Sequence, residues 1–333
     1  MNVNYTRREC LALLASTAVL PSLRLTAAGK PMRGAFMILS TPFTGTGAVD
    51  WDDLVKETEF VDRCGAHGVV WPQGSSGVAT LTKDERLRGM DVLAKAIQGR
   101  KTALVLGVQG KDAPEMLEYA RHAEALAPDA MIAMPPSAAR SVDEYREYFR
   151  ALAQVTTRPV IVQTSGGARD LPPPVDLIVS LAREFPQLGY VKEESAPVVE
   201  RMTAEIAQRP PLTSVFGASF ATGWLYEMRL GLDGVITGNA MYADLMARMW
   251  EFHERGQQDP LRDAFSKLLL MRNLSAQIPG ADLYVMKKRG IFKTTTTRSG
   301  GTGAAAKVTT LAFTPDQITE IEYRFAALTP YLS

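Results

Sequence analysis

Leu188-Gly189-Tyr190-Val191-Lys192-Glu193-Glu194 is a short apolar run that ends in a lysine and is followed by two glutamates. Seven further apolar runs of this length occur past residue 34, separated by segments with apolar residues at intervals of three and four. Such alternation is typical of parallel βα units. Eight units in a row predict an α/β protein with a closed (β/α)8 (TIM) barrel. An open doubly wound sheet is the alternative, but no G-x-G-x-x-G motif follows any of the runs.

The repeat also sets the expected domain organisation. The predicted strands are residues 35–39, 68–71, 103–106, 130–134, 160–163, 189–192, 214–217 and 234–237, and the clearest predicted helices are 51–63, 83–97, 114–126, 142–155, 175–185 and 220–230. Beyond the eighth run only helical patterns remain, so we expect a barrel over residues 33–245 and a helical C-terminal extension over residues 246–333. Residues 294–310, rich in Thr, Gly, Ser and Ala, are predicted to be a mobile loop.

Composition and charge limit the classes of partner. The chain has 333 residues, of which 46% are hydrophobic and 22% charged, as in ordinary globular proteins. Its 37 basic residues nearly balance 36 acidic ones. This balance gives no electrostatic case for binding nucleic acid or an anionic membrane surface. A small molecule is the expected partner.

The N-terminal residues 1–29 have the layout of an export signal. The adjacent Arg7 and Arg8 precede an apolar stretch and then small residues near Ala28, a pattern that resembles a twin-arginine signal. The apolar stretch is too short to span a bilayer. We therefore expect an exported, periplasmic protein that is not bound to the membrane after the signal is cleaved. A frayed amphipathic helix is the alternative.

Cysteines and histidines give little sign of metal or redox chemistry. Of the two cysteines, Cys10 lies inside the expected signal, so the mature chain would retain Cys64 alone and no internal disulfide. The three histidines have no second ligand-type residue at metal-binding spacing. No metal site is expected.

Two segments carry candidate catalytic residues, because the active site of such a barrel lies at the carboxyl ends of its strands. Lys192 ends the sixth run, and a buried, partly neutral amine there would form a Schiff base with a ketone. Gly74-Ser75-Ser76-Gly77 follows the second run, and its hydroxyls and backbone N–H groups suit a carboxylate. The alternatives are a solvated, ion-paired lysine and a plain turn before a helix capped by Thr82 and Glu85.

The order of these motifs resembles the dihydrodipicolinate synthase and N-acetylneuraminate lyase family of Schiff-base aldolases and dehydratases. The resemblance covers about residues 33–329. Its motifs are Thr41-Pro42-Phe43, the Gly74–Gly77 turn followed by Leu81-Thr82, Tyr190-Val191-Lys192-Glu193, and Gly234-Val235-Ile236-Thr237-Gly238. Each motif is weak alone, but their joint order along eight βα units identifies the chain as a member of this family.

The resemblance implies roles for several residues. Lys192 corresponds to the Schiff-base lysine, and Gly74, Ser75 and Ser76 correspond to the turn that holds the keto-acid carboxylate. Ile236 would line the pocket through its backbone carbonyl. The family needs no metal or organic cofactor, and its members imply a homotetramer or a dimer.

The chain also departs from the family at a central position. A tyrosine that shuttles protons in the family is replaced by Gln163, which makes this a divergent member. An amide does not act as a proton-transfer acid near neutral pH. With Lys192, Ser75 and Gln163 as the candidate catalytic residues, we expect water, Ser75, Ser165 or Glu193 to take over the proton transfers, and Ser165 also to contact substrate.

A second departure concerns the mouth of the barrel. The family's aromatic pair after the fourth strand is replaced by Pro135-Pro136-Ser137, and Met134, Pro135 and Trp71 are expected to form an apolar mouth. Two functions stay open. The chain is either a lyase that acts on a 2-keto acid or keto sugar acid, or a non-catalytic barrel that binds such an acid.

Overall fold

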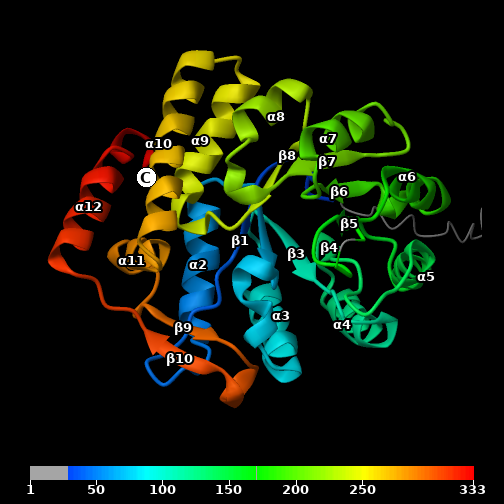
Figure 1. The fold of residues 1–333 in the computed structure, drawn as a ribbon, viewed down its shortest axis with the longest axis horizontal. Helices are drawn as coiled ribbons and strands as arrows, with labels where there is room; N and C mark the ends of the chain where they lie inside the picture. Colours follow the sequence, from blue (N-terminus) through cyan, green and yellow to red (C-terminus); the bar gives the residue numbers. More distant parts are fainter. Residues whose placement is uncertain (1–28, 170) are drawn as a thin grey trace, which may run out of the picture.

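The computed structural model describes residues 29–169 and 171–333, so the expected export signal lies almost wholly outside the described residues. Eight parallel strands form a closed barrel in which each strand pairs with the next and β8 pairs with β1 (Figure 1). The strands are β1 (Gly34–Ile38), β2 (Gly68–Trp71), β3 (Ala103–Gly107), β4 (Ala130–Ala133), β5 (Val160–Gln163), β6 (Tyr190–Lys192), β7 (Ser214–Gly217) and β8 (Gly234–Thr237). The predicted (β/α)8 barrel is confirmed.

Helices surround the barrel and continue into a C-terminal extension. The barrel helices are α2 (Trp51–Arg63), α3 (Lys83–Ala96), α4 (Ala113–Leu126), α5 (Val142–Ala153), α6 (Val175–Glu184), α7 (Val198–Ile206), α8 (Trp224–Leu230) and α9 (Ala243–Glu254). The extension contains α10 (Gln258–Gln277), α11 (Ala281–Lys288) and α12 (Pro315–Ala326) and lies beside α9 (Figure 1). Residue 245, the expected end of the barrel, falls inside α9. None of the described helices is long and apolar enough to cross a membrane.

Polar side chains cap several of the barrel helices. Asp50 accepts a hydrogen bond from the Asp53 amide at the start of α2, and Asp112 does the same for α4. Thr82 and Glu85 form the expected capping box of α3, with reciprocal bonds of 3.1 and 2.9 Å. Each cap satisfies backbone N–H groups that the helix leaves without a partner. The caps therefore fix where these helices begin after each βα loop.

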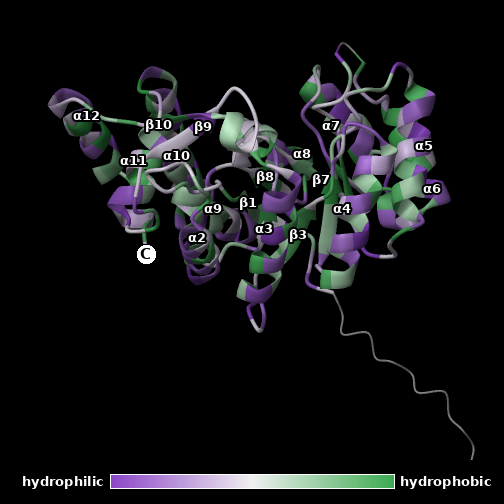
Figure 2. Cartoon of the chain, turned by 90° about the horizontal axis from the view of Figure 1, so that it is seen from below, coloured by the Kyte–Doolittle hydropathy of each residue, from purple (hydrophilic) through white to green (hydrophobic). Residues whose placement is uncertain are grey.

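Two apolar layers hold the strands in place. Inside the barrel, Phe36, Ile132, Ile161, Phe216 and Ile236 belong to one buried cluster. A larger cluster fills the space between the strands and the helices. In Figure 2 the barrel strands are mostly hydrophobic, as expected for strands buried on both faces. The helices carry both hydrophilic (purple) and hydrophobic (green) residues. The interior cluster closes the barrel beneath the carboxyl ends of its strands.

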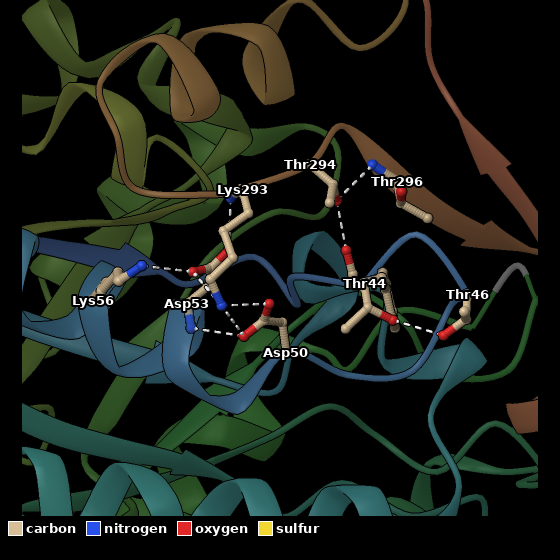
Figure 3. Close-up of polar contacts among 9 residues, drawn as sticks. Thr44, Thr46, Asp50, Asp53, Lys56, Lys293, Thr294 and Thr296 are labelled. Carbon is tan, nitrogen blue, oxygen red and sulfur yellow. Dashed lines mark hydrogen bonds and ion pairs between the residues drawn. The ribbon is translucent and has the colours of Figure 1, made fainter.

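Residues 294–310 are not the mobile loop that their composition predicts. They contain an antiparallel hairpin of β9 (Thr296–Ser299) and β10 (Lys307–Thr310). Lys293, just before the hairpin, donates its backbone N–H to the buried Asp53 and its Nζ to Asp50 (Figure 3). Thr294 donates to the carbonyl oxygen of Phe43. The prediction failed because small polar residues can pair as strands when another surface supports them.

Arg298 of the hairpin is the strongest link to the loops that follow β1 and β2. Its guanidinium forms two hydrogen bonds of 2.8 and 2.9 Å with the Glu85 carboxylate and donates to the Gly47 carbonyl oxygen at 2.7 Å. It also lies over the ring of Phe43. A bidentate pair of this kind is both strong and directional. The hairpin therefore braces the segment that carries the serine turn.

Replacing Arg298 should loosen the hairpin more than the barrel. We expect Arg298→Ala to lower the unfolding free energy by about 2 kcal/mol, less than a fully buried pair would lose because Glu85 is partly exposed. Hydrogen exchange, followed by mass spectrometry, should become faster over residues 294–310. Arg262→Ala, which removes an exposed pair with Asp259, is the matched control and should change neither quantity. Unchanged exchange over the hairpin in Arg298→Ala would contradict this account.

Candidate active site

The side chain of Lys192 points into the barrel at the carboxyl end of β6. Side chains alternate between the two faces of a strand, and Tyr190 packs against the apolar cluster inside the barrel. Lys192, two residues later, faces the same interior, one layer closer to the mouth. Gln163 of β5 is its direct partner in the strand register. The structure therefore brings these two candidate residues together at the end of the barrel where active sites lie.

Burial determines the state of the Lys192 amine. Only 3% of the residue is exposed. Its Nζ lies 3.2 Å from Glu194 Oε2 and donates a hydrogen bond of 3.4 Å to Gln163 Oε1. Loss of hydration lowers the pKa of Lys192, and the nearby Glu194 carboxylate partly opposes this shift. The alternative of a solvated lysine is therefore wrong. Because its pKa is lowered, the neutral, nucleophilic form of the Lys192 amine becomes populated at a lower pH than in free lysine.

Four side chains form a closed ring of polar contacts, which we call the Lys192 ring: Lys192, Gln163, Ser165 and Glu194. Gln163 Nε2 donates to Ser165 Oγ at 2.9 Å, and Ser165 Oγ donates to Glu194 Oε2 at 2.5 Å. The same Oε2 faces the Lys192 amine. The Glu194 side chain keeps 20% of its surface exposed. The ring therefore connects a buried amine to a carboxylate that reaches solvent.

Glu193 faces away from this ring. Its Oε1 accepts hydrogen bonds of 2.6 Å from Thr164 Oγ1 and from the Ser195 amide, and its Oε2 lies 3.0 Å from Arg201. Glu193 lies between Lys192 and Glu194, and Thr164 lies between Gln163 and Ser165. Because alternate residues face opposite sides, Glu193 and Thr164 both point outward. The expectation that Glu193 takes over proton transfer is wrong for this geometry. Glu193 instead fixes the loop that carries Glu194.

A second buried carboxyl lies behind Glu193. Glu205 of α7 is fully buried, and both of its carboxyl oxygens lack a hydrogen-bond partner that meets ordinary geometric limits among the described residues. Burial, followed by the neighbouring Glu193, raises the pKa of Glu205 to about 10. Glu205 therefore stays protonated near neutral pH. The nearby charges of Glu193 and Arg201 can then balance one another.

The two serines of the glycine-rich turn have different roles. Ser76 is buried, and its Oγ donates to the Leu39 carbonyl oxygen at 2.6 Å and accepts from the Gln73 amide at 3.0 Å. Its own amide bonds to the Gln73 carbonyl oxygen. Its hydroxyl and amide are thus engaged within the protein, and the structure does not present them to a ligand as the sequence analysis expected.

Ser75, by contrast, is exposed at the mouth. Neither its hydroxyl nor the amides of Gly74 and Ser75 form a hydrogen bond to another described residue. A Cβ built on Gly238, the residue after β8, would lie 3.0 Å from Ser75 Oγ. Ser75 therefore sits over the carboxyl end of β8. The hydroxyl and the two amides form the part of the turn that is available to an anion.

A chain of hydrogen bonds holds this turn in place. Trp71 Nε1 donates to Thr41 Oγ1 at 3.0 Å, and Thr41 Oγ1 donates to the Ser76 carbonyl oxygen at 2.6 Å. Trp71 is fully buried against Gly89 of α3, where a Cβ would approach its ring to 2.2 Å. The expectation that Trp71 lines the mouth is wrong, because the residue faces outward from its strand. It supports the turn from behind.

Ile236 and Gly238 lie on the inward face of the last strand and its continuation. The Ile236 side chain packs in the interior cluster with Phe36 and Phe216, beneath the mouth. At Gly238, two residues later, an added Cβ would meet Ser75 and Phe220. The structure thus places the Ile236 side chain in the floor of the barrel. Gly238 lies nearer than Ile236 to Ser75, where an anion could bind.

Phe220 is a site residue that the sequence analysis did not identify. It belongs to Ser219, Phe220 and Ala221, three consecutive residues with φ between 50° and 60°. This left-handed turn replaces the start of the helix predicted at residue 220, and α8 begins only at Trp224. Arg272 of α10 lies 4.2 Å from the Phe220 ring centroid. Strained turns of non-glycine residues are concentrated at functional sites, and here the turn holds an aromatic ring against Gly238.

A cavity of about 430 Å³ is lined by Gly166, the residue after Ser165, but by none of the four side chains of the Lys192 ring. Met134 and Pro135 line it, as expected for the mouth, and Arg86 and Lys111 add positive charge. Arg86 stacks on Tyr119 with 3.5 Å between its guanidinium carbon and the ring centroid. The mouth is therefore less apolar than the sequence suggested.

The described residues contain no cluster of three or more His, Cys, Asp or Glu side chains that could hold a metal ion. Cys64 is partly buried, and burial raises the pKa of its thiol to about 11. A thiol with a raised pKa is a poor nucleophile. Lys192 is therefore the strongest candidate nucleophile in the part of the chain that the structure describes.

Comparisons with known proteins place this geometry in a family. Residues 31–302 match the Dihydrodipicolinate synthetase family. The chain is 27% identical over 175 residues to the 4-hydroxy-tetrahydrodipicolinate synthase of Rhizobium meliloti, covering 52% of this chain and 58% of that enzyme. It is 27% identical over 246 residues to the enzyme of the same name from Methanococcus vannielii, covering 73% and 83%.

A solved structure supports the same assignment at the level of the fold. The N-acetylneuraminate lyase of Proteus mirabilis superposes with a TM-score of 0.73 at 17% identity, covering 89% of this chain and 98% of the lyase. At this identity the likeness concerns the fold alone. The family match extends over most of the chain and includes both the serine turn and Lys192. This chain therefore belongs to the Dihydrodipicolinate synthetase family.

Proposed function

We propose that this protein is a Schiff-base lyase, an aldolase or dehydratase, that acts on a 2-keto acid or keto sugar acid. The observation that carries the proposal is the buried Lys192 amine with a lowered pKa at the mouth of the closed barrel. Family membership supports it, since the curated relatives are named as synthases and a structural neighbour as a lyase. Ser75, with the amides of Gly74 and Ser75, is the proposed anchor for the substrate carboxylate.

The reaction begins at the carbonyl carbon of the keto acid. The neutral Lys192 amine adds to this carbon and gives a carbinolamine, whose hydroxyl then takes a proton and leaves as water. The product is a protonated imine, which draws electrons from the adjacent bond and so permits C–C or C–O cleavage without another electron sink. Gln163 fits this scheme as a hydrogen-bond partner that orients the amine, because its amide does not exchange protons readily.

The cavity that Gly166 lines is the proposed position for the part of the substrate that extends away from Lys192. Its wall includes the positive side chains of Arg86 and Lys111 as well as Met134. We further propose that the protein is exported to the periplasm, on the basis of the twin-arginine pattern at Arg7 and Arg8, and that it is a homo-oligomer, dimer or tetramer, as the family suggests.

Covalent trapping separates a lyase from a binding protein. We expect intact-mass measurement to show a reduced pyruvyl adduct after incubation with pyruvate and cyanoborohydride, and peptide mapping to place it on Lys192. Lys192→Met should abolish the adduct because it removes the amine but keeps much of the side-chain volume. Lys307→Met, at an exposed position of the hairpin, is the matched control. No adduct with any of a panel of keto acids would instead favour a binding protein.

The pH dependence of trapping tests the lowered pKa of Lys192. A depressed pKa means that the neutral amine becomes populated at a lower pH than in free lysine, whose pKa is about 10.4. The initial rate of adduct formation between pH 6 and 10 should therefore level off at lower pH than for N-acetyl-lysine amide measured alongside. A rate that rises in parallel with that of the model amine throughout would contradict the lowered pKa.

Two serine variants test the anchor. Ser75→Ala should raise the pyruvate concentration needed for half-maximal trapping about 10-fold to 100-fold, as expected for a hydrogen bond to a charged group worth roughly 1.5–3 kcal/mol. Ser76→Ala removes a hydroxyl that bonds only to the protein, so its main effect should be a lower melting temperature. The assignment is wrong if Ser76→Ala weakens pyruvate binding and Ser75→Ala does not.

A further inference from the structure

We propose that Glu194 is the catalytic acid and base that moves protons to and from Lys192 and its imine, an inference that rests on the proposed Schiff-base function. Glu194 Oε2 lies 3.2 Å from the atom that would react, Lys192 Nζ. A group at this distance can exchange a proton directly with the amine.

The other ring members do not supply this function. Gln163 carries an amide, which has no suitable acid form near neutral pH. Ser165 donates its hydroxyl proton to Glu194 at 2.5 Å, so the carboxylate rather than the serine holds the negative charge. Glu193 contacts Thr164, Ser195 and Arg201 on the opposite face and does not reach the amine. Among the described residues that contact Lys192, Glu194 is the group able to gain and lose a proton.

Access to solvent distinguishes Glu194 from a purely structural partner. Its side chain is 20% exposed, whereas that of Lys192 is 4% exposed. The carboxyl can therefore receive a proton from the buried amine on one side and exchange it with water on the other.

Proton balance shows what Glu194 does at each stage. The carboxylate first takes a proton from the Lys192 ammonium, which gives a carboxylic acid and a neutral amine. After the amine adds to the ketone, a proton passes from the new ammonium nitrogen to the alkoxide and gives the carbinolamine. The acid then returns its own proton to the carbinolamine hydroxyl, which leaves as water. The regenerated carboxylate can then remove a proton from the carbon next to the imine, forming an enamine. No other reactant is consumed.

Surrounding contacts hold Glu194 in this position. The Glu194 amide donates to Thr164 Oγ1 at 2.8 Å, and Thr164 Oγ1 in turn donates to Glu193. Glu193 is fixed by Arg201. Since these groups face outward from the strands, they orient the backbone of Glu194 without competing for its carboxylate. Ser165 then fixes the carboxylate itself.

The test compares Glu194→Gln with wild type and with Glu200→Gln, a matched control that removes the same charge at an exposed position of α7. The first measurement is the rate of pyruvyl adduct formation at pH 7.5. The second is exchange of the pyruvate methyl hydrogens with solvent in D₂O, followed by NMR, which reports enamine formation. We expect Glu194→Gln to slow both about 10²-fold to 10⁴-fold, the usual contribution of a general acid or base. Glu200→Gln should stay within twofold of wild type.

A merely structural role of Glu194 predicts that the rate of adduct formation rises in Glu194→Gln instead of falling. If Glu194 only kept Lys192 charged, its removal would lower the pKa of the amine further and speed adduct formation at pH 7.5. Equal or faster trapping in Glu194→Gln would therefore overturn the inference. Glu194→Ala offers a second readout, because added formate should restore part of its rate if a carboxylate is what is missing. Wild type that traps no keto acid would instead refute the Schiff-base function itself.

Discussion

The site depends on the burial of one amine inside a closed ring of strands. An ammonium removed from water loses much hydration energy, and the protein must replace it with other contacts or accept the neutral form. At Lys192 the barrel replaces part of the lost hydration with polar contacts and also favours the neutral form. Gln163 and Glu194 provide two polar contacts, while the lowered pKa shows that these contacts do not fully replace water. This incomplete compensation favours the neutral form of the amine, which is the form that the proposed reaction needs.

The remaining structure fixes the elements that must meet at the barrel mouth. Lys192 ends β6, whereas Ser165 and Ser75 follow β5 and β2, so their relative positions depend on the strand register and on the loops. The loops are braced from outside the barrel. Thr41 and Trp71 support the serine turn, and Arg298 joins the C-terminal hairpin to Glu85 and Gly47. The extension thus contributes to the site through the first two βα loops.

Sequence reasoning predicted the barrel, the strands and the position of Lys192, because apolar runs buried on both faces leave a clear periodic signal. It missed features that depend on side-chain direction. The spacing of two between Lys192 and Glu194 places both on the inward face, and Gln163 and Ser165 share that spacing. This spacing is visible in the sequence, but the expected role in proton transfer was given to Glu193 and not to Glu194. The hairpin and the left-handed turn at Phe220 depend on tertiary contacts with Asp53 and Arg272, which no local pattern shows.

The position of Glu194 involves two opposing effects. A carboxylate beside the amine raises the pKa of Lys192 and so reduces the population of the nucleophile, while an amine without a nearby base has no partner for proton transfer. The ion pair of 3.2 Å between Lys192 and Glu194 resolves this opposition, because transfer of one proton converts it into a neutral amine and a neutral acid. Burial favours that neutral pair, since it removes the water that would stabilise the charges. The environment that lowers the pKa of Lys192 therefore favours release of its proton, and the Glu194 carboxylate lies 3.2 Å away to receive it.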